Sequence, residues 1–125
     1  LMYAKLLKEK LDKYGSIVYL VNTGWVGGSP SSGAKRISIK DTRNIITSIL
    51  DGSIEQSTFY KEDFFGLEIP HELKNVNSAI LNPKNAWSNQ SSYVEVAERL
   101  AEMFKENFNQ YGEEVDYLKK HGPII

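Results

Sequence analysis

The 125-residue sequence predicts a single domain of the α/β class, with α+β character at its edges. A charged, amphipathic helical segment opens the chain, and a glycine and a five-residue apolar run follow it, in the order typical of a helix leading into a buried strand. A second amphipathic segment, residues 92–111, has an apolar stripe at helical spacing. With 41% hydrophobic residues and no break in composition, the sequence supplies one core and gives no sign of a second domain.

The charge balance and the lack of cysteine exclude several classes of function. The sequence has 15 Lys and Arg residues against 16 Asp and Glu residues, so it lacks the excess of positive charge with which proteins hold nucleic acid. Without cysteine it has no disulfide framework, no thiol nucleophile and no cysteine-based metal site. Its two histidines, His71 and His121, stand far apart, so we do not expect a histidine-rich metal site either.

The longest uncharged run, residues 14–34, has 21 residues and therefore the length of a membrane span. Only residues 17–21 are continuously apolar, and the glycines, proline and serines that follow would leave backbone groups unpaired in lipid. We therefore expect no membrane segment, no signal peptide and a cytoplasmic location. Because the sequence opens with Leu1 and not with methionine, we also expect it to be a piece of a longer protein.

Residues 1–52 are expected to form a helix, a strand, a glycine-rich loop and a second helix. Apolar residues at helical spacing predict a helix over residues 1–13, ended by Gly15. The β-branched run 17–21 is typical of a strand covered on both faces, residues 22–34 form the loop, and residues 35–40 alternate as an extended segment does. Asp41 is expected to cap a helix over residues 42–51, which ends at Gly52 and buries Ile45, Ile46, Ile49 and Leu50.

Residues 53–125 contain weaker signals and one clear helix. Residues 58–60 and 64–69 are expected to be short strands, and residues 75–90 irregular surface structure interrupted by Pro83. Ser92 and Glu95 form a capping-box pattern at the start of the closing helix, and residues 113–125 are expected to add a short helical turn. The apolar stripe of the closing helix consists of Ala97, Leu100, Ala101, Phe104, Phe108 and Tyr111.

The glycine-rich loop and the basic segment after it have the residue types that are typical of a ligand-binding site. Residues 35–43 carry four basic side chains and one acidic side chain, a local charge of +3, which indicates a small anionic ligand. The alternative is a flexible surface loop with solvated lysines. The loop approaches the phosphate-binding pattern G-x-x-x-x-G-K-[ST], but Ala34 separates its glycine from the lysine and Arg36 replaces the hydroxyl, so we expect no true phosphate loop here.

Several long motifs, together with Asn82-Pro83 and the closing helix, resemble the ATP-dependent phosphoenolpyruvate carboxykinase family. The motifs are LVNTGW (residues 20–25), KRISIKDTR (residues 35–43) and FGLEIP (residues 65–70). The resemblance covers essentially the whole chain and corresponds to the C-terminal portion of that enzyme, about its last quarter. It implies that residues 1–125 are the C-terminal part of the nucleotide-binding domain, a mixed sheet with flanking helices, in which residues 1–52 carry the adenine-edge segment and residues 53–125 complete the fold.

The resemblance also implies an activity, the conversion of oxaloacetate and ATP to phosphoenolpyruvate, ADP and carbon dioxide in gluconeogenesis. ATP is a substrate there, and a divalent metal, Mg²⁺ or Mn²⁺, takes part. The family's phosphate-binding loop, metal ligands and oxaloacetate-binding arginine belong to sequence that precedes the part matched here. We therefore expect this chain to contain no catalytic residue and no metal ligand, to pack against the rest of the enzyme, and to be inactive alone.

Carried over by position, Arg36, Ile37 and Thr42 are the residues that the resemblance implies contact the nucleotide. Their chemistry suits an adenine ring, because a guanidinium stacks on a purine face, a branched aliphatic covers it, and a hydroxyl reaches its polar edge. The loop 26–34 is longer than in short-loop members, and Ala34 stands where a glycine often precedes the lysine. Two alternatives from other classes stay open at this point: a free-standing nucleotide- or anion-binding regulatory module, and a purely structural lobe.

Overall fold

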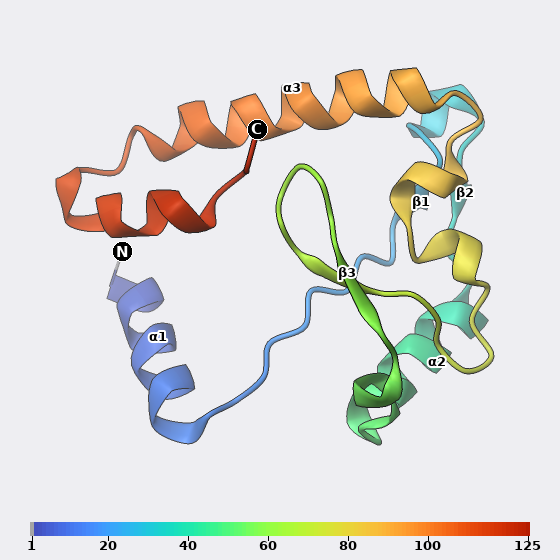
Figure 1. The fold of residues 1–125 in the computed structure, drawn as a ribbon, viewed down its shortest axis with the longest axis horizontal. Helices are drawn as coiled ribbons and strands as arrows, with labels where there is room; N and C mark the ends of the chain where they lie inside the picture. The colour runs from blue at the N-terminus through green and yellow to red at the C-terminus, as the bar shows by residue number, and fades with distance from the viewer. Residues whose placement is uncertain (1) are drawn as a thin grey trace.

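The computed structural model describes residues 2–125 and shows helices arranged around two small sheets (Figure 1). The α-helices and strands are α1 (Met2–Tyr14), β1 (Trp25–Val26), β2 (Lys35–Arg36), α2 (Ile39–Leu50), β3 (Phe59–Lys61), β4 (Glu68–Pro70) and α3 (Gln90–Phe108). The 3₁₀ helices are η1 (Pro30–Ser32), η2 (Ser53–Gln56), η3 (Ser78–Ile80), η4 (Pro83–Ala86) and, after α3, η5 (Glu113–His121). The mixed class of helices and strands that the sequence predicts is confirmed.

Both sheets are antiparallel pairs. β1 pairs with β2, with Trp25 opposite Arg36, and the glycine-rich loop connects the two strands. β3 pairs with β4, with Tyr60 opposite Ile69. Within residues 2–125 each sheet therefore has two strands, and these residues by themselves do not form the larger mixed sheet that the resemblance implies.

The predicted strand over residues 17–21 is wrong, because this segment is neither a strand nor buried. It runs as an extended connection between α1 and β1 (Figure 1), and Ile17, Val18 and Leu20 are 66%, 60% and 80% exposed. A strand covered on both faces needs neighbours along both edges and a layer above and below. The described residues supply no strand that pairs with this one.

The first helix is confirmed as α1, although Leu1 lies outside the described residues. α1 ends where the sequence predicts, because Gly15 has a left-handed φ of 60° and its N–H donates to the carbonyl oxygen of Leu11 at 2.8 Å. No residue of α1 is buried, and an exposed ion pair of 2.9 Å between Lys5 and Glu114 joins it to η5. The apolar stripe of α1 is therefore open to solvent.

The second helix begins earlier than predicted because Ser38, and not Asp41, is its N-cap. The Ser38 hydroxyl oxygen accepts from the Asp41 N–H at 3.0 Å, and the hydroxyl donates to the Asp41 carboxylate at 2.7 Å. Asp41 thus takes the third helical position, where a carboxylate completes the cap. The expected burial is partly wrong: Ile45 and Ile49 are half-buried, but Ile46 is exposed and Leu50 is 81% exposed.

The closing helix also begins earlier than predicted. The side-chain oxygen of Asn89 accepts from the N–H groups of Ser91 and Ser92 at 3.0 and 3.2 Å, so Asn89 is the N-cap and the capping box at Ser92 and Glu95 is wrong. Of the predicted stripe, Ala97 and Ala101 are buried, Phe108 is half-buried, and the other members are exposed. The tail forms η5, a 3₁₀ helix of nine residues and therefore more than the short turn predicted.

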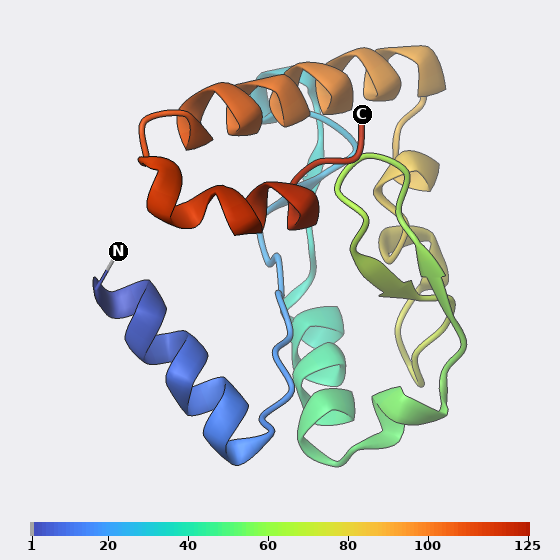
Figure 2. The ribbon, with the colours of Figure 1, turned by 60° about the vertical axis from the view of Figure 1, so that its left-hand side comes forward.

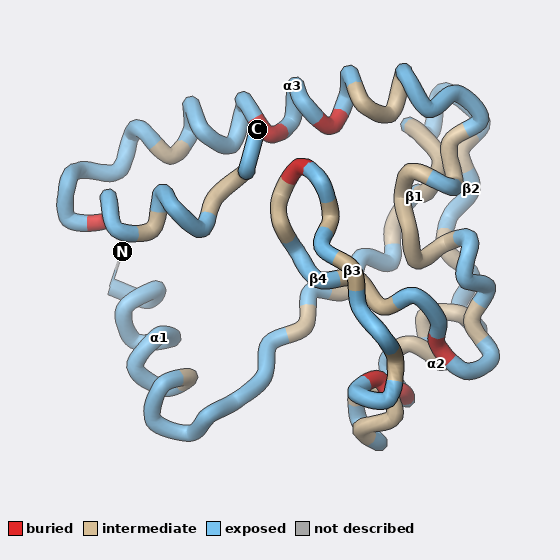
Figure 3. The backbone as a smooth tube through the Cα atoms, viewed as in Figure 1, coloured by how far each residue is buried: buried red, intermediate tan, exposed pale blue. Residues whose placement is uncertain are grey.

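The β3–β4 hairpin confirms two short strands after residue 57 but shifts the second. A turn occupies the start of the predicted strand 64–69: the Phe65 N–H donates to the Glu62 carboxylate at 2.7 Å, and Gly66 has a φ of 67°. β4 consequently begins at Glu68 and includes Pro70. The buried residues lie at separate places along the chain (Figure 3) and are Ser48, Ile54, Phe64, Leu73, Ala97, Ala101 and Val115.

Candidate functional site

The β1–β2 hairpin holds the two long motifs of the first half against each other. Arg36 lies opposite Trp25, and the Ile37 N–H donates to the carbonyl oxygen of Gly24 at 3.0 Å. The Gly24 N–H in turn donates to the side-chain oxygen of Asn22 at 2.8 Å. Asn22 and Gly24 of the first motif thus form a turn, and the hydrogen bond from Ile37 to this turn holds the basic segment in place.

Gly27 joins this hairpin to the second half of the chain. Its φ of 84° is left-handed, and a Cβ at this position would lie 2.5 Å from the carbonyl oxygen of Ala86 in η4. A side chain here would both strain the backbone and collide with backbone atoms. The glycine-rich loop therefore packs closely against η4, which Asn82 caps and Pro83 begins.

Arg36, Ile37 and Thr42 all lie at the junction between β2 and α2. Arg36 is exposed at the end of β2, Ile37 is half-buried and precedes the cap Ser38, and Thr42 is half-buried in the first turn of α2. The Thr42 N–H donates to the carbonyl oxygen of Ser38 at 2.9 Å. The structure thus brings the three residues onto one strand-to-helix junction.

The junction is positively charged and open. Lys35, Arg36, Lys40 and Arg43 are all exposed, and within residues 2–125 none of them forms an ion pair. The Asp41 carboxylate accepts from the Ser38 hydroxyl, within the cap. The four cations remain available to a ligand or to another polypeptide.

An apolar groove of about 1150 Å³ runs beside the junction. Ile37 lines it together with the whole of residues 17–21, and α2 contributes Ile45 and Ile49. Arg36 and Thr42 do not line it. Of the three predicted contact residues, Ile37 alone borders this hollow.

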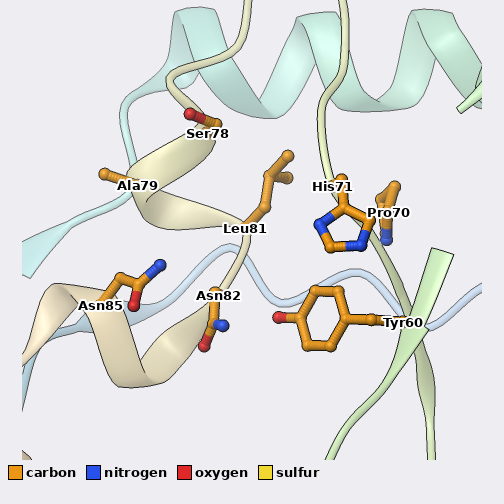
Figure 4. A pocket seen from close by; sticks show the side chains of 8 residues that line it. All are labelled: Tyr60, Pro70, His71, Ser78, Ala79, Leu81, Asn82 and Asn85. Carbon is orange, nitrogen blue, oxygen red and sulfur yellow. The ribbon is translucent and has the colours of Figure 1, made fainter. Parts of the chain in front are cut away.

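A smaller pocket of about 490 Å³ lies between the β3–β4 hairpin and the helices η3 and η4 (Figure 4). The rings of Tyr60 and His71 face it with centroids 4.9 Å apart, and the Tyr60 hydroxyl is buried without a hydrogen-bond partner. Burial, together with the negative charges of Glu62 and Asp63, raises the pKa of Tyr60. No sequence pattern indicates this pocket, because its residues come from separate segments with no motif in common.

Tyr93, on α3, packs against two aromatic side chains. Its ring lies 5.8 Å from that of Phe64 and 5.9 Å from that of Trp87, both edge-on. Burial is the main cause that raises the pKa of Tyr93 to about 12, and the Glu62 carboxylate adds to the effect. This cluster attaches α3 to the hairpin and is structural.

Two further findings concern residues 2–125. No helix among them is long and apolar enough to cross a membrane. The same residues contain no group of three or more His, Asp or Glu side chains placed to hold a metal ion.

The fold and the junction define a mixed α/β polypeptide with an open basic strand-to-helix turn beside an apolar groove. The family model for phosphoenolpyruvate carboxykinase matches residues 1–79. The chain therefore belongs to the phosphoenolpyruvate carboxykinase family, as its motifs indicate.

Curated relatives named phosphoenolpyruvate carboxykinase (ATP) match nearly the whole chain. The protein from Sulfurimonas denitrificans is 50% identical over 127 residues, which cover 99% of this chain and 24% of that protein. The protein from Campylobacter jejuni subsp. doylei is 48% identical with the same coverage, and that from Caldanaerobacter subterraneus is 43% identical over 98% of this chain and 23% of its own length. The chain thus spans about a quarter of the length of the curated relatives that it matches.

Proposed function

We propose that this chain is the part of an ATP-dependent phosphoenolpyruvate carboxykinase that contacts the adenine end of the nucleotide. The complete cytoplasmic enzyme converts oxaloacetate and ATP to phosphoenolpyruvate, ADP and carbon dioxide, a reaction of gluconeogenesis. The relatives that carry this name at up to 50% identity across 99% of the chain support the proposal. They do not favour a free-standing regulatory module, because each is about four times as long as the segment matched.

The observation that carries the site assignment is the junction between β2 and α2. Two adjacent residues and a third in the first turn of α2 carry a guanidinium, a branched aliphatic and a hydroxyl at this junction. In our proposal Arg36 stacks on the adenine ring, Ile37 covers its other face, and Thr42 reaches its polar edge. The net positive charge of residues 35–43 favours a polyanionic nucleotide nearby.

Catalysis belongs, in this proposal, to the remainder of the enzyme. Phosphoryl transfer depends on groups that grip the phosphates and on metal ions that neutralise the developing charge. The residues that supply these functions in the family, including those that hold Mg²⁺ or Mn²⁺, are expected in sequence outside this chain. We propose accordingly that the chain alone has neither decarboxylase nor kinase activity, and that it packs against the rest of the enzyme.

The test is the Arg36→Ala substitution in the complete enzyme that carries this sequence. Loss of the stacked guanidinium is expected to weaken ATP binding by ~1–3 kcal/mol, roughly a 5- to 150-fold higher Kd, measured by isothermal titration. Lys40→Ala is the matched control, because it removes one exposed charge from the same segment without removing a proposed contact. A Kd for ATP that is the same in Arg36→Ala and wild type would reject this role for Arg36.

A further inference from the structure

The pocket between the β3–β4 hairpin and the helices η3 and η4 is separate from the proposed adenine contact, with which it shares no residue (Figure 4). Its volume of about 490 Å³ falls within the range of ligand pockets, roughly 300–1,000 Å³. Five of its lining side chains are polar, and among residues 2–125 those that line it include no Asp, Glu, Lys or Arg. The lining residues are Tyr60, Pro70, His71, Ser78, Ala79, Leu81, Asn82 and Asn85.

Backbone hydrogen bonds hold two walls of this pocket in place. On one wall, Tyr60 belongs to β3 and the His71 N–H donates to the carbonyl oxygen of Thr58 at 2.9 Å, so the two rings are fixed beside each other. On the other wall, the Asn82 side-chain oxygen accepts from the Lys84 N–H at 3.0 Å and caps η4. The amide N–H groups of Asn82 consequently remain for another acceptor.

The Tyr60 hydroxyl is the polar atom of this pocket that lacks a partner. It is buried, and within residues 2–125 nothing hydrogen-bonds to it. Figure 4 shows it pointing from β3 across the pocket toward Asn82. A buried hydroxyl that stays unpaired is unfavourable, so a molecule that hydrogen-bonds to it in the pocket gains affinity from the contact.

The charges near the pocket favour an uncharged ligand. Burial raises the pKa of Tyr60, and the negative charges of Glu62 and Asp63 raise it further, so its hydroxyl stays protonated and able to donate. The same two carboxylates repel an anion. The described residues place no carboxylate on the wall of the pocket that would hold a cation.

The polar groups of the pocket match a ligand that is rich in hydroxyls. They are hydroxyl, carboxamide and imidazole groups, which in their neutral form both donate and accept hydrogen bonds. Sugar hydroxyls have the same double capacity. The C–H face of a sugar ring is apolar and packs against aromatic and aliphatic side chains, which Tyr60, His71 and Leu81 supply here.

We propose that this pocket binds a neutral mono- or disaccharide, with the Tyr60 hydroxyl and the Asn82 amide as its central contacts. The Tyr60 O–H donates to one sugar hydroxyl and the Asn82 amide donates to another, so that the sugar bridges the two walls. The site goes beyond the proposed function and does not depend on it, because none of its contacts belongs to the β2–α2 junction.

The test titrates the complete enzyme that carries this sequence with D-glucose, D-fructose and trehalose, followed by saturation-transfer difference NMR. At least one of these probes is expected to bind in the millimolar range, and saturating ATP is expected not to displace it. Tyr60→Phe is expected to raise the Kd of that probe about 2- to 10-fold, because one hydrogen bond is lost. Tyr117→Phe is the matched control, since Tyr117 is exposed and does not line the pocket.

A second variant closes the pocket without removing a hydrogen-bonding group. Ala79 lines the pocket and is exposed, so Ala79→Trp is expected to leave the fold intact, to fill part of the hollow and to abolish binding of the probe. The ATP Kd is expected to be unchanged in both variants, because neither alters the β2–α2 junction.

The ligand-free enzyme gives an independent check. Tyr60→Phe is expected not to lower its Tm, because the hydroxyl that it removes has no partner among residues 2–125. A lower Tm would show that the remainder of the enzyme already satisfies this hydroxyl, and would overturn the proposal. So would failure of all three probes to bind, displacement of the probe by ATP, or an equal Kd in wild type and Tyr60→Phe.

Discussion

At the scale of single residues, the junction explains why the long motifs contain the residues they do. The side chain of Asn22 accepts from the Gly24 N–H, and the Gly24 carbonyl oxygen accepts from the Ile37 N–H. Gly27 packs against η4 at a place that has no room for a side chain. Ser38 begins the helix that carries Thr42. Ser38 stands among the proposed contact residues in the sequence, whereas Asn22 and Gly24 belong to the first motif, which the pairing of β1 with β2 brings beside the second.

The proposed contact residues could be named from the sequence, but the pocket at Tyr60 and His71 could not. The former lie within nine consecutive residues, whereas the latter are brought together by the pairing of β3 with β4 and by the approach of η3. Pairing register between segments of two or three residues depends on tertiary packing, and no periodicity of so short a strand reveals it.

Also at the residue scale, Tyr93 predicts how stability depends on pH. Because the folded state raises the pKa of Tyr93 to about 12, its neutral form stabilises the fold, and this contribution is complete below the ordinary tyrosine pKa near 10. Between about pH 10 and pH 12 it is lost as the unfolded chain releases the proton first. Tyr93→Phe is expected to reduce the fall in Tm across this range.

The measurement is the thermal unfolding midpoint at pH 9 and at pH 11.5. Tyr3→Phe serves as the control, because Tyr3 is 85% exposed on α1. Equal slopes for wild type, Tyr93→Phe and Tyr3→Phe would contradict the assignment of this dependence to Tyr93.

At the scale of elements, the sequence predicts that three helices exist, but it does not predict the residues at which α2 and α3 begin. The three predicted helices are confirmed as α1, α2 and α3, which have 12 to 19 residues each. The caps of α2 and α3 differ from the prediction because several polar residues precede each of these two helices, and only the backbone geometry decides which one accepts from the first free N–H groups. In α3 that residue is Asn89, three positions before the serine favoured by the pattern.

The cap of α3 gives a prediction for this element. Asn89→Ala leaves two N–H groups of the first turn without their acceptor, and is expected to lower the free energy of unfolding by about 0.5–2 kcal/mol. Ser92→Ala is the matched control, since Ser92 lies inside the helix and its change is expected to cost no more than a few tenths of a kcal/mol. Denaturant unfolding of both variants checks this, and a larger loss in Ser92→Ala would reinstate the capping box.

At the scale of the whole molecule, the chain has the features of a part taken up by a larger fold. The buried residues are scattered along the chain, while α1 and residues 17–21 keep large apolar side chains exposed. In the ribbon, α1 lies at one edge of the molecule (Figure 2). At residues 17–21 the apolar run predicts a strand covered on both faces, and the prediction is wrong because residues 2–125 supply neither a pairing strand nor the covering layers. The local sequence pattern predicts the secondary structure that a segment prefers, and the packing around the segment decides whether that structure forms.

The central claim is that the junction at Arg36, Ile37 and Thr42 binds the adenine end of the nucleotide and not its phosphates. The most direct test compares ADP with ATP in the complete enzyme, wild type against Arg36→Ala, by isothermal titration. A contact with adenine predicts that the substitution raises the Kd of both nucleotides by the same factor, since both carry the same base. A loss that is much greater for ATP than for ADP would place Arg36 at the phosphates and contradict this account.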